Sequence, residues 1–292
     1  MEAITRTDRF LAAIAGDGKA PKPITRKEYY YAYMLGEVDE YPEPITREDK
    51  LLVSLIENGI LSGGISIKEF AQDGLQKNSI SDSAVTAVRD YAFTNNKIIE
   101  TVDFPNLKTV KQYAFAFCSS LKTIDLSNVT ELGESAFQQA ALEGALSLTK
   151  YNPSSVAKYI FRGNKFTSIS IPLAKVLGHS MFIYCDQATS VNLPLVETMN
   201  DWTFAYCTKL KTVTLPKIKT LTRYTFGYSR LEKLVLPNSV VCTIAADTFI
   251  DTPIAQGTGY VYVPDNLLNS YKSATNWSAI GDQIKPMSEL EG

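Results

Sequence analysis

Hydrophobic side chains recur along the chain with a period of about 22 residues, each time around a phenylalanine. The eight phenylalanines are Phe93, Phe115, Phe137, Phe161, Phe182, Phe204, Phe226 and Phe249. Five residues before each of them stands an aliphatic residue or methionine: Val88, Val110, Leu132, Val156, Leu177, Met199, Leu221 and Ile244. This regularity indicates an array of structural repeats, because a single coil of this length cannot bury its apolar side alone.

A second apolar motif follows each phenylalanine by about 10 residues. It has the form apolar-x-x-apolar-x-apolar, as in Leu121 to Leu126 and in Leu210 to Leu215. Its last four residues alternate between inward and outward positions, which is typical of a half-buried strand. A proline often ends the strand, since proline has no N–H for the ladder: Pro105, Pro172, Pro194, Pro216 and Pro237. We therefore expect eight coils over residues 83–263, with a parallel sheet and a phenylalanine ladder inside.

One coil carries the full repeat motif, Ala-Phe-x-x-Cys-x-x-Leu-x-x-Ile-x-Leu, from Ala114 to Leu126. This motif resembles the BspA-like leucine-rich repeats. The resemblance implies a leucine-rich-repeat solenoid, and surface proteins that adhere to host matrix or cells without catalysing a reaction. The fourth coil departs from the motif, because the segment 138–159 is longer and its strand, 143–148, is weak in sequence. A bulge or kink is expected there.

The C-terminal residues 264–292 are expected to cap the solenoid, which would otherwise expose its core and a strand edge. The segment 259–263 predicts the last strand. Asp265 is predicted to N-cap a helix, and Trp277, Ile280 and Ile284 are predicted to fold over the end.

The N-terminal residues 1–60 contain three segments that begin with Ile-Thr-Arg, at Ile4, Ile24 and Ile45. Apolar residues follow at helical spacing, which predicts three short helices for attachment or self-association. These segments are loosely similar to structural proteins of gut bacteriophages and prophages. Residues 61–82 are expected to be a linker or an N-terminal cap. The predicted fold class is thus an α+β repeat protein: a leucine-rich-repeat solenoid with a parallel β-sheet, preceded by a small all-α region.

Composition argues against several classes of function. The formal net charge of −2 does not fit a basic nucleic-acid-binding surface, and no apolar run is long enough to predict membrane insertion. The single histidine, His179, falls at a position that other repeats fill with polar residues, which predicts a solvated loop residue. No glycine-rich phosphate loop or Cys-x-x-Cys pair is present. We expect no enzyme, no cofactor and no metal site.

The cysteines also follow the repeats. Cys118, Cys185 and Cys207 each stand three residues after a repeat phenylalanine, whereas Cys242 does not. Other coils place small residues at this position, so buried free thiols are expected. A disulfide between Cys185 and Cys207, in adjacent coils, remains sterically conceivable.

Outward strand positions form two predicted columns along the sheet. The first column consists of Thr101, Thr123, Ser168, Ser190 and Thr212, and it continues to Lys233. The second column consists of Asp103, Asp125, Ser170, Asn192 and Thr214, and it continues to Val235. Such a polar face suits hydrogen bonding to a glycan or an extended polar surface, although threonine also simply favours strands. Aromatic residues cluster instead near the phenylalanine turns, where a ligand is expected to reach them: Tyr91, Tyr113, Tyr159, Tyr184, Trp202, Tyr206, Tyr224 and Tyr228.

Two functions remain open at this stage. One is adhesion, with the solenoid recognising a protein or glycan on a host or cell surface. The other is a structural spacer or fibre component of a phage virion or surface assembly. The chain starts with a poor secretory signal, yet a role outside the cell, on a surface or in a virion is favoured.

Overall fold

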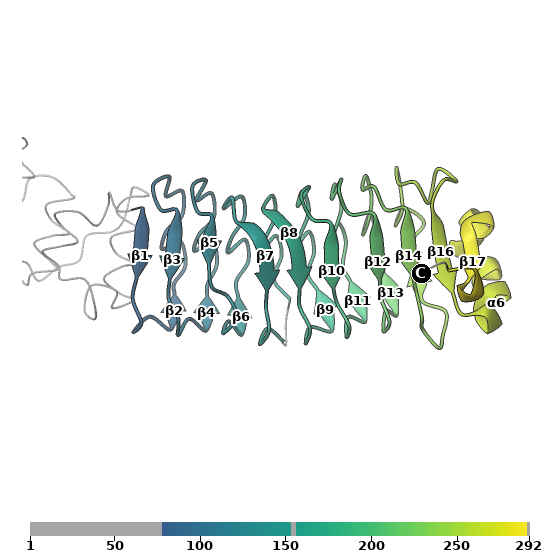
Figure 1. The fold of residues 1–292 in the computed structure, drawn as a ribbon, viewed down its shortest axis with the longest axis horizontal. Coiled ribbons are helices and arrows are strands. Elements are labelled where there is room, and N and C mark those ends of the chain that lie inside the picture. Colours follow the sequence, from purple (N-terminus) through teal and green to yellow (C-terminus); the bar gives the residue numbers. More distant parts are fainter. Residues whose placement is uncertain (1–77, 153–155, 291–292) are drawn as a thin grey trace, which may run out of the picture.

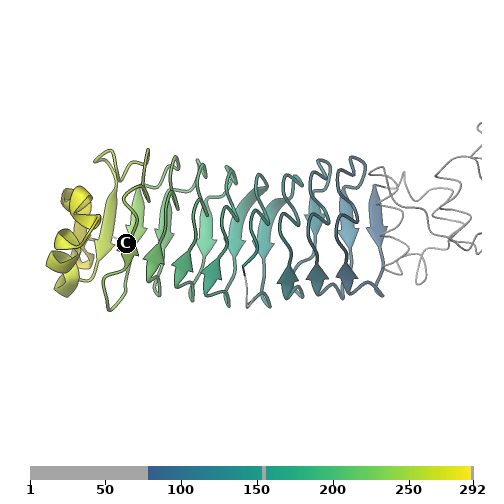
Figure 2. The same ribbon diagram turned by 180° about the vertical axis from the view of Figure 1, so that it is seen from behind.

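The computed structural model describes residues 78–152 and 156–290. This part of the chain winds into a solenoid in which each coil contributes a strand to a front sheet, and most coils contribute a shorter strand behind it (Figure 1). The front strands lie side by side along the whole length of the solenoid, and the C-terminal helices cover one end. The view from behind shows the row of shorter strands (Figure 2). The predicted helices of residues 1–60 lie outside the described residues.

The strand bounds follow the repeat motif. The front strands are β1 (Ser79–Ser81), β3 (Thr101–Asp103), β5 (Thr123–Ile124), β7 (Glu143–Ser147), β8 (Lys165–Ser170), β10 (Ser190–Asn192), β12 (Thr212–Thr214), β14 (Lys233–Val235), β16 (Tyr260–Val263) and β17 (Ile284–Pro286). The back strands are β2 (Ala87–Val88), β4 (Thr109–Val110), β6 (Glu131–Leu132), β9 (Val176–Leu177), β11 (Thr198–Met199), β13 (Thr220–Leu221) and β15 (Thr243–Ile244). Every pair is parallel, as expected when successive coils repeat the same path.

The phenylalanine ladder predicted from the sequence is confirmed. The rings stack from Phe93 to Phe249 with centroid separations from 4.9 Å to 6.2 Å and nearly parallel planes. These side chains are buried. The apolar residue five positions before the phenylalanine, such as Val110 or Met199, is also buried in every coil except at the half-buried Val156, so both apolar positions of the motif form the core.

The sheet of the solenoid extends beyond both predicted ends, residues 83 and 263. The strand β1 lies within residues 61–82 and pairs with β3, so one more coil strand precedes the predicted first coil. At the other end, the segment 259–263 is not the last strand. The strand β17 pairs in parallel with β16 and extends the sheet into the predicted cap.

The C-terminal cap consists of η2 (Asp265–Leu267), α6 (Leu268–Ser273), η3 (Trp277–Gln283) and η4 (Met287–Glu289). Trp277 is fully buried, and its ring lies 6.0 Å from that of Phe249, so it closes the phenylalanine ladder. Its indole N–H donates to the carbonyl of Cys242. The prediction that Asp265 N-caps a helix is wrong. Its carboxylate instead accepts a hydrogen bond from the Ser288 N–H, which ties η2 to η4.

All four cysteines are free and buried, as predicted. The thiols of Cys118, Cys185 and Cys207 each donate to the carbonyl of the phenylalanine one coil earlier. Asn164, at the same position of its coil, donates from its side-chain amide to the carbonyl of Phe137. In these four coils, the side chain at this position satisfies a buried carbonyl.

We predict that the phenylalanine ladder sets the stability of the solenoid. Phe204→Ala should lower the free energy of unfolding by ~3–5 kcal/mol, because it removes a buried ring from the middle of the stack. Urea denaturation followed by circular dichroism measures this change. A loss below about 1 kcal/mol would show that the ring contributes little packing energy.

We also predict that the native thiols do not react. Burial raises the pKa values of Cys118, Cys185 and Cys242 to about 12 and raises that of Cys207 as well, so almost no thiolate exists at pH 8. Mass spectrometry should find no iodoacetamide adduct on the native protein and four adducts after denaturation. Rapid labelling of the native protein, or a Cys185–Cys207 crosslink, would contradict this.

Candidate binding face

The two columns predicted from the sequence lie in register on the exposed side of the front sheet. Thr101 pairs with Thr123, Ser168 with Ser190, and Thr212 with Lys233. We call the first five predicted residues the Thr101 column and the second five the Asp103 column. The strand β7 continues both columns, because Ala145 and Ser147 pair with Ser168 and Ser170 of β8. The columns end near the C-terminal cap. Val235, which was predicted to face outward, is buried there.

Most hydroxyl groups of the two columns have no partner within the described part of the protein. The cross-strand hydrogen bonds that form join Ser81 to Asp103 and Asn192 to Ser170. The hydroxyls that make none are those of Thr101, Thr123, Ser168, Ser190, Thr212 and Thr214. An exposed hydroxyl of this kind both donates and accepts, and it is available to a ligand at little desolvation cost.

Some threonines behind the sheet behave differently. Thr130, Thr222 and Thr243 each donate to a backbone carbonyl of the preceding coil, which helps to hold the coils together. Thr109 and Thr198, in the back strands, make no side-chain hydrogen bond within the described residues, as on the front face.

The strand of the fourth coil takes part in a bulge, as its sequence predicts. The pairing shifts between Gly144 and Ala145 of β7, and the extra, unpaired residue is Thr167 of the neighbouring strand β8. Gly144 adopts a φ of +76°, a conformation that glycine takes without strain. The expectation of a weak strand is wrong, because β7 is five residues long and pairs with β8 over its length. On its other side, β7 does not pair with β5. Strand pairing in the front sheet is also interrupted between β10 and β12.

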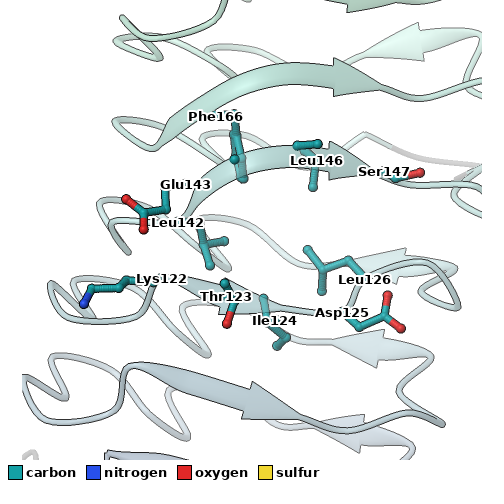
Figure 3. Close-up of a pocket in the computed structure, with 12 residues that line it drawn as sticks. Lys122, Thr123, Ile124, Asp125, Leu126, Leu142, Glu143, Leu146, Ser147 and Phe166 are labelled. Atoms are coloured by element: carbon teal, nitrogen blue, oxygen red, sulfur yellow. The ribbon is translucent and has the colours of Figure 1, made fainter.

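The break between β5 and β7 opens a slit of about 330 Å³ in the front face (Figure 3). Leu126, Leu142, Leu146 and Phe166 line its floor. Ile124 at the slit is only half-buried, as is Val191 beside the other break, whereas the equivalent residues Val102, Ile169 and Val213 are within 2% of full burial. The volume lies at the small end of the range for ligand sites in proteins.

Hydrogen bonds close the slit at both ends. At one end the Glu143 N–H donates to the Lys122 carbonyl over 3.2 Å. At the other, the Thr149 hydroxyl donates to the Ser127 carbonyl over 2.8 Å. Between these points the strands part. The amide at this position of the motif donates to the next coil at Leu148, Ile171 and Leu215. Within the described residues, the amides of Phe104, Leu126 and Leu193 make no such bond.

The charges around the slit differ between its two ends. Glu143 pairs in register with Lys165, and Lys122 forms a 3.2 Å ion pair with Glu100, so positive and negative groups alternate there. The other end carries the exposed carboxylate of Asp125, with Ser147 across the slit (Figure 3). The Asp103 column includes a second exposed carboxylate, Asp103, and no lysine or arginine. This end of the slit therefore offers the carboxylate of Asp125, while the exposed Lys150, next to Thr149, donates to the side chain of Asn128.

The aromatic residues predicted near the phenylalanine turns form a second exposed feature. We call Tyr184, Trp202, Tyr206, Tyr224 and Tyr228 the aromatic array. All five residues have a φ between +56° and +62°, which is unusual for bulky side chains. Tyr206 lies between Tyr184 and Tyr228 at 4.6 Å and 4.7 Å, and Trp202 lies 4.0 Å from Tyr224.

Guanidinium groups cover the ends of the aromatic array. Arg162 lies 5.5 Å over the ring of Tyr184, and Arg223 lies 5.2 Å over that of Tyr224 while it pairs with Asp247. Most ring faces are thus covered by another ring or by a guanidinium group. A sugar would need an open ring face, so the expected reach of a ligand to these residues stays a prediction.

Other chemistry predicted from the sequence can be located as well. His179 is half-buried, and its Nδ1 lies 2.8 Å from the Ser180 hydroxyl, so it is not the freely solvated residue that we expected. Across the described residues, no three His, Cys, Asp or Glu side chains are grouped to hold a metal ion. A search of the same residues finds no helix with the length and apolarity needed to span a membrane.

Comparison with solved structures finds similar chains at low identity. A leucine-rich repeat protein from Bacteroides ovatus is 18% identical, over 71% of this chain and 82% of that one, with a TM-score of 0.29. A leucine rich cell surface protein from Faecalibacterium prausnitzii is 17% identical, over 69% and 80%, with a TM-score of 0.29. The pneumococcal vaccine antigen PcpA is 13% identical, over 72% and 77%, with a TM-score of 0.30. Nothing further is inferred from likenesses at these TM-scores.

A search of curated proteins finds no match to the chain. Comparison with models of protein families does identify a family. The family described as BspA type Leucine rich repeat region matches residues 56–150 and 154–274 in six copies. These residues make up more than half of the chain and include the repeats aligned above. No match supports the resemblance of residues 1–60 to phage proteins. The chain belongs to the family of BspA-type leucine-rich repeat proteins.

Proposed function

We propose that this protein is a non-catalytic binding protein that adheres to a protein or glycan on a host or cell surface through its front sheet. The observation that carries the proposal is the row of open hydroxyls in the Thr101 column and at Thr214, none of which has a partner within the described residues. Amide and carboxylate groups in the Asp103 column extend the same face. Together they offer donors and acceptors at the spacing of adjacent strands, about 4.8 Å.

Rigidity supports the same proposal. Each coil is fixed by parallel pairing and by the phenylalanine ladder, so the hydroxyls are held in position before a ligand arrives. A preformed face loses less conformational entropy on binding than a flexible one. Attachment or self-association through residues 1–60 remains part of the proposal and would present several such faces together.

An array of glycans and extracellular-matrix proteins, probed with the full chain, tests this function. We expect at least one ligand class to bind, and we expect the triple variant T123K/S190K/T212K to weaken that binding by tenfold or more, since three long charged side chains would cover the hydroxyl column. The matched control T130K/T222K/T243K places the same charges on the opposite side and should retain binding, provided that circular dichroism shows it folded.

Two results would count against the proposal. Binding that survives T123K/S190K/T212K unchanged would move the site away from the front sheet. The absence of any ligand on the array would favour a structural spacer.

A further inference from the structure

The slit between β5 and β7 has features that the open hydroxyls do not explain. Its floor is apolar, it lies within the front face, and the Leu126 amide at its edge makes no backbone hydrogen bond to the next coil within the described residues. A glycan would place hydroxyl groups against Leu142 and Leu146, which would leave them without partners at a cost in free energy. An apolar group would instead continue the core outward.

We propose that the slit receives one apolar side chain of a polypeptide partner, and that a lysine or arginine two residues away in that partner pairs with Asp125. This inference rests on the proposed function, and it names the class of ligand that one part of the front face takes.

The apolar part of the proposal follows from the size and lining of the slit. About 330 Å³ accommodates a single large side chain such as phenylalanine or leucine, and the floor of Leu126, Leu142, Leu146 and Phe166 removes it from water. The partner's backbone would lie above the slit, within reach of the open Thr123 and Ser147 hydroxyls at its rim.

The basic part follows from the charges. Asp125 is exposed at the open end, and one of its carboxylate oxygens accepts the Ser127 N–H, which holds the side chain in place. Asp103 lies on the adjacent strand of the same column, while Lys122 is at the opposite end of the slit and pairs with Glu100. Lys150, the exposed lysine beside Thr149, is engaged with the side chain of Asn128. A positive group of a partner can therefore pair with the carboxylate of Asp125.

The spacing follows from strand geometry. In an extended polypeptide, residues i and i+2 point to the same side, about 6.6 Å apart. One side chain can then enter the slit while the other reaches along the strand direction toward Asp125. A residue at i+1 would point away from the face. The predicted recognition pattern is thus apolar-x-basic.

Four fluorescein-labelled peptides of seven residues test the proposal by fluorescence anisotropy with the full chain. They share a serine and threonine background and carry Phe-x-Lys, Ala-x-Lys, Phe-x-Glu or Phe-Lys at their centre. We expect Phe-x-Lys to bind best: about tenfold or more tighter than Ala-x-Lys, and about two- to fivefold tighter than Phe-x-Glu at low salt. Added salt should remove the second difference but not the first.

Variants of the protein locate the site. D125N keeps the acceptor for Ser127 and removes the charge, so it should abolish the preference for Lys over Glu and retain the preference for Phe over Ala. A145W places an indole at the rim of the slit and should abolish binding of all four peptides; its thermal unfolding shows whether it folds. D186N, at an exposed position outside the slit lining, is the matched control and should behave as the unmodified protein.

The outcomes separate this proposal from the broader function. Equal binding of the four peptides, no binding of any peptide, or an unchanged charge preference in D125N would overturn it. If an array ligand depends on the Thr101 column while the peptides do not bind, the proposed function stands and the polypeptide pocket is wrong.

Discussion

The register between successive coils is the constraint on which the rest of the structure depends. Parallel pairing fixes each strand against the next, and the phenylalanine rings stack ring on ring from Phe93 to Phe249. Once the register is fixed, a side chain repeated at one position of the motif becomes a column along the solenoid. The hydroxyls of the front face, the thiols that satisfy phenylalanine carbonyls, and the aromatic array are all consequences of this rule.

The slit is a consequence of the same constraint. The fourth coil is longer than its neighbours, yet its phenylalanine, Phe137, and that of the next coil, Phe161, remain stacked at 5.5 Å. The extra length therefore cannot shift the ladder. Pairing of β7 with β8 is kept, with a bulge at Thr167 of β8, and pairing of β7 with β5 is lost, so the core becomes accessible from the front face through the slit.

Much of this architecture could be predicted from the sequence, because it depends on periodicity. The core positions, the parallel strands, the buried cysteines and a bulge beside the strand of the fourth coil all follow from the spacing of apolar residues. The slit could not, because the sequence does not say which neighbouring strand β7 would leave. The strand β17 was also missed, since Ile284–Pro286 is too short to show alternation and pairs only because the cap holds it beside β16. Asp265 accepts from Ser288 instead of capping a helix, and this depends on residues that the fold brings near.

The central claim is that β5 and β7 do not pair, so that the front sheet is open between them. Amide hydrogen exchange of the full chain, followed residue by residue by NMR, tests this most directly. The Leu126 amide should exchange much faster than the Leu148 and Leu215 amides, which occupy the same position in their coils and donate to the next strand. Equal protection of the three amides would show that β5 and β7 pair in solution, and it would contradict the account.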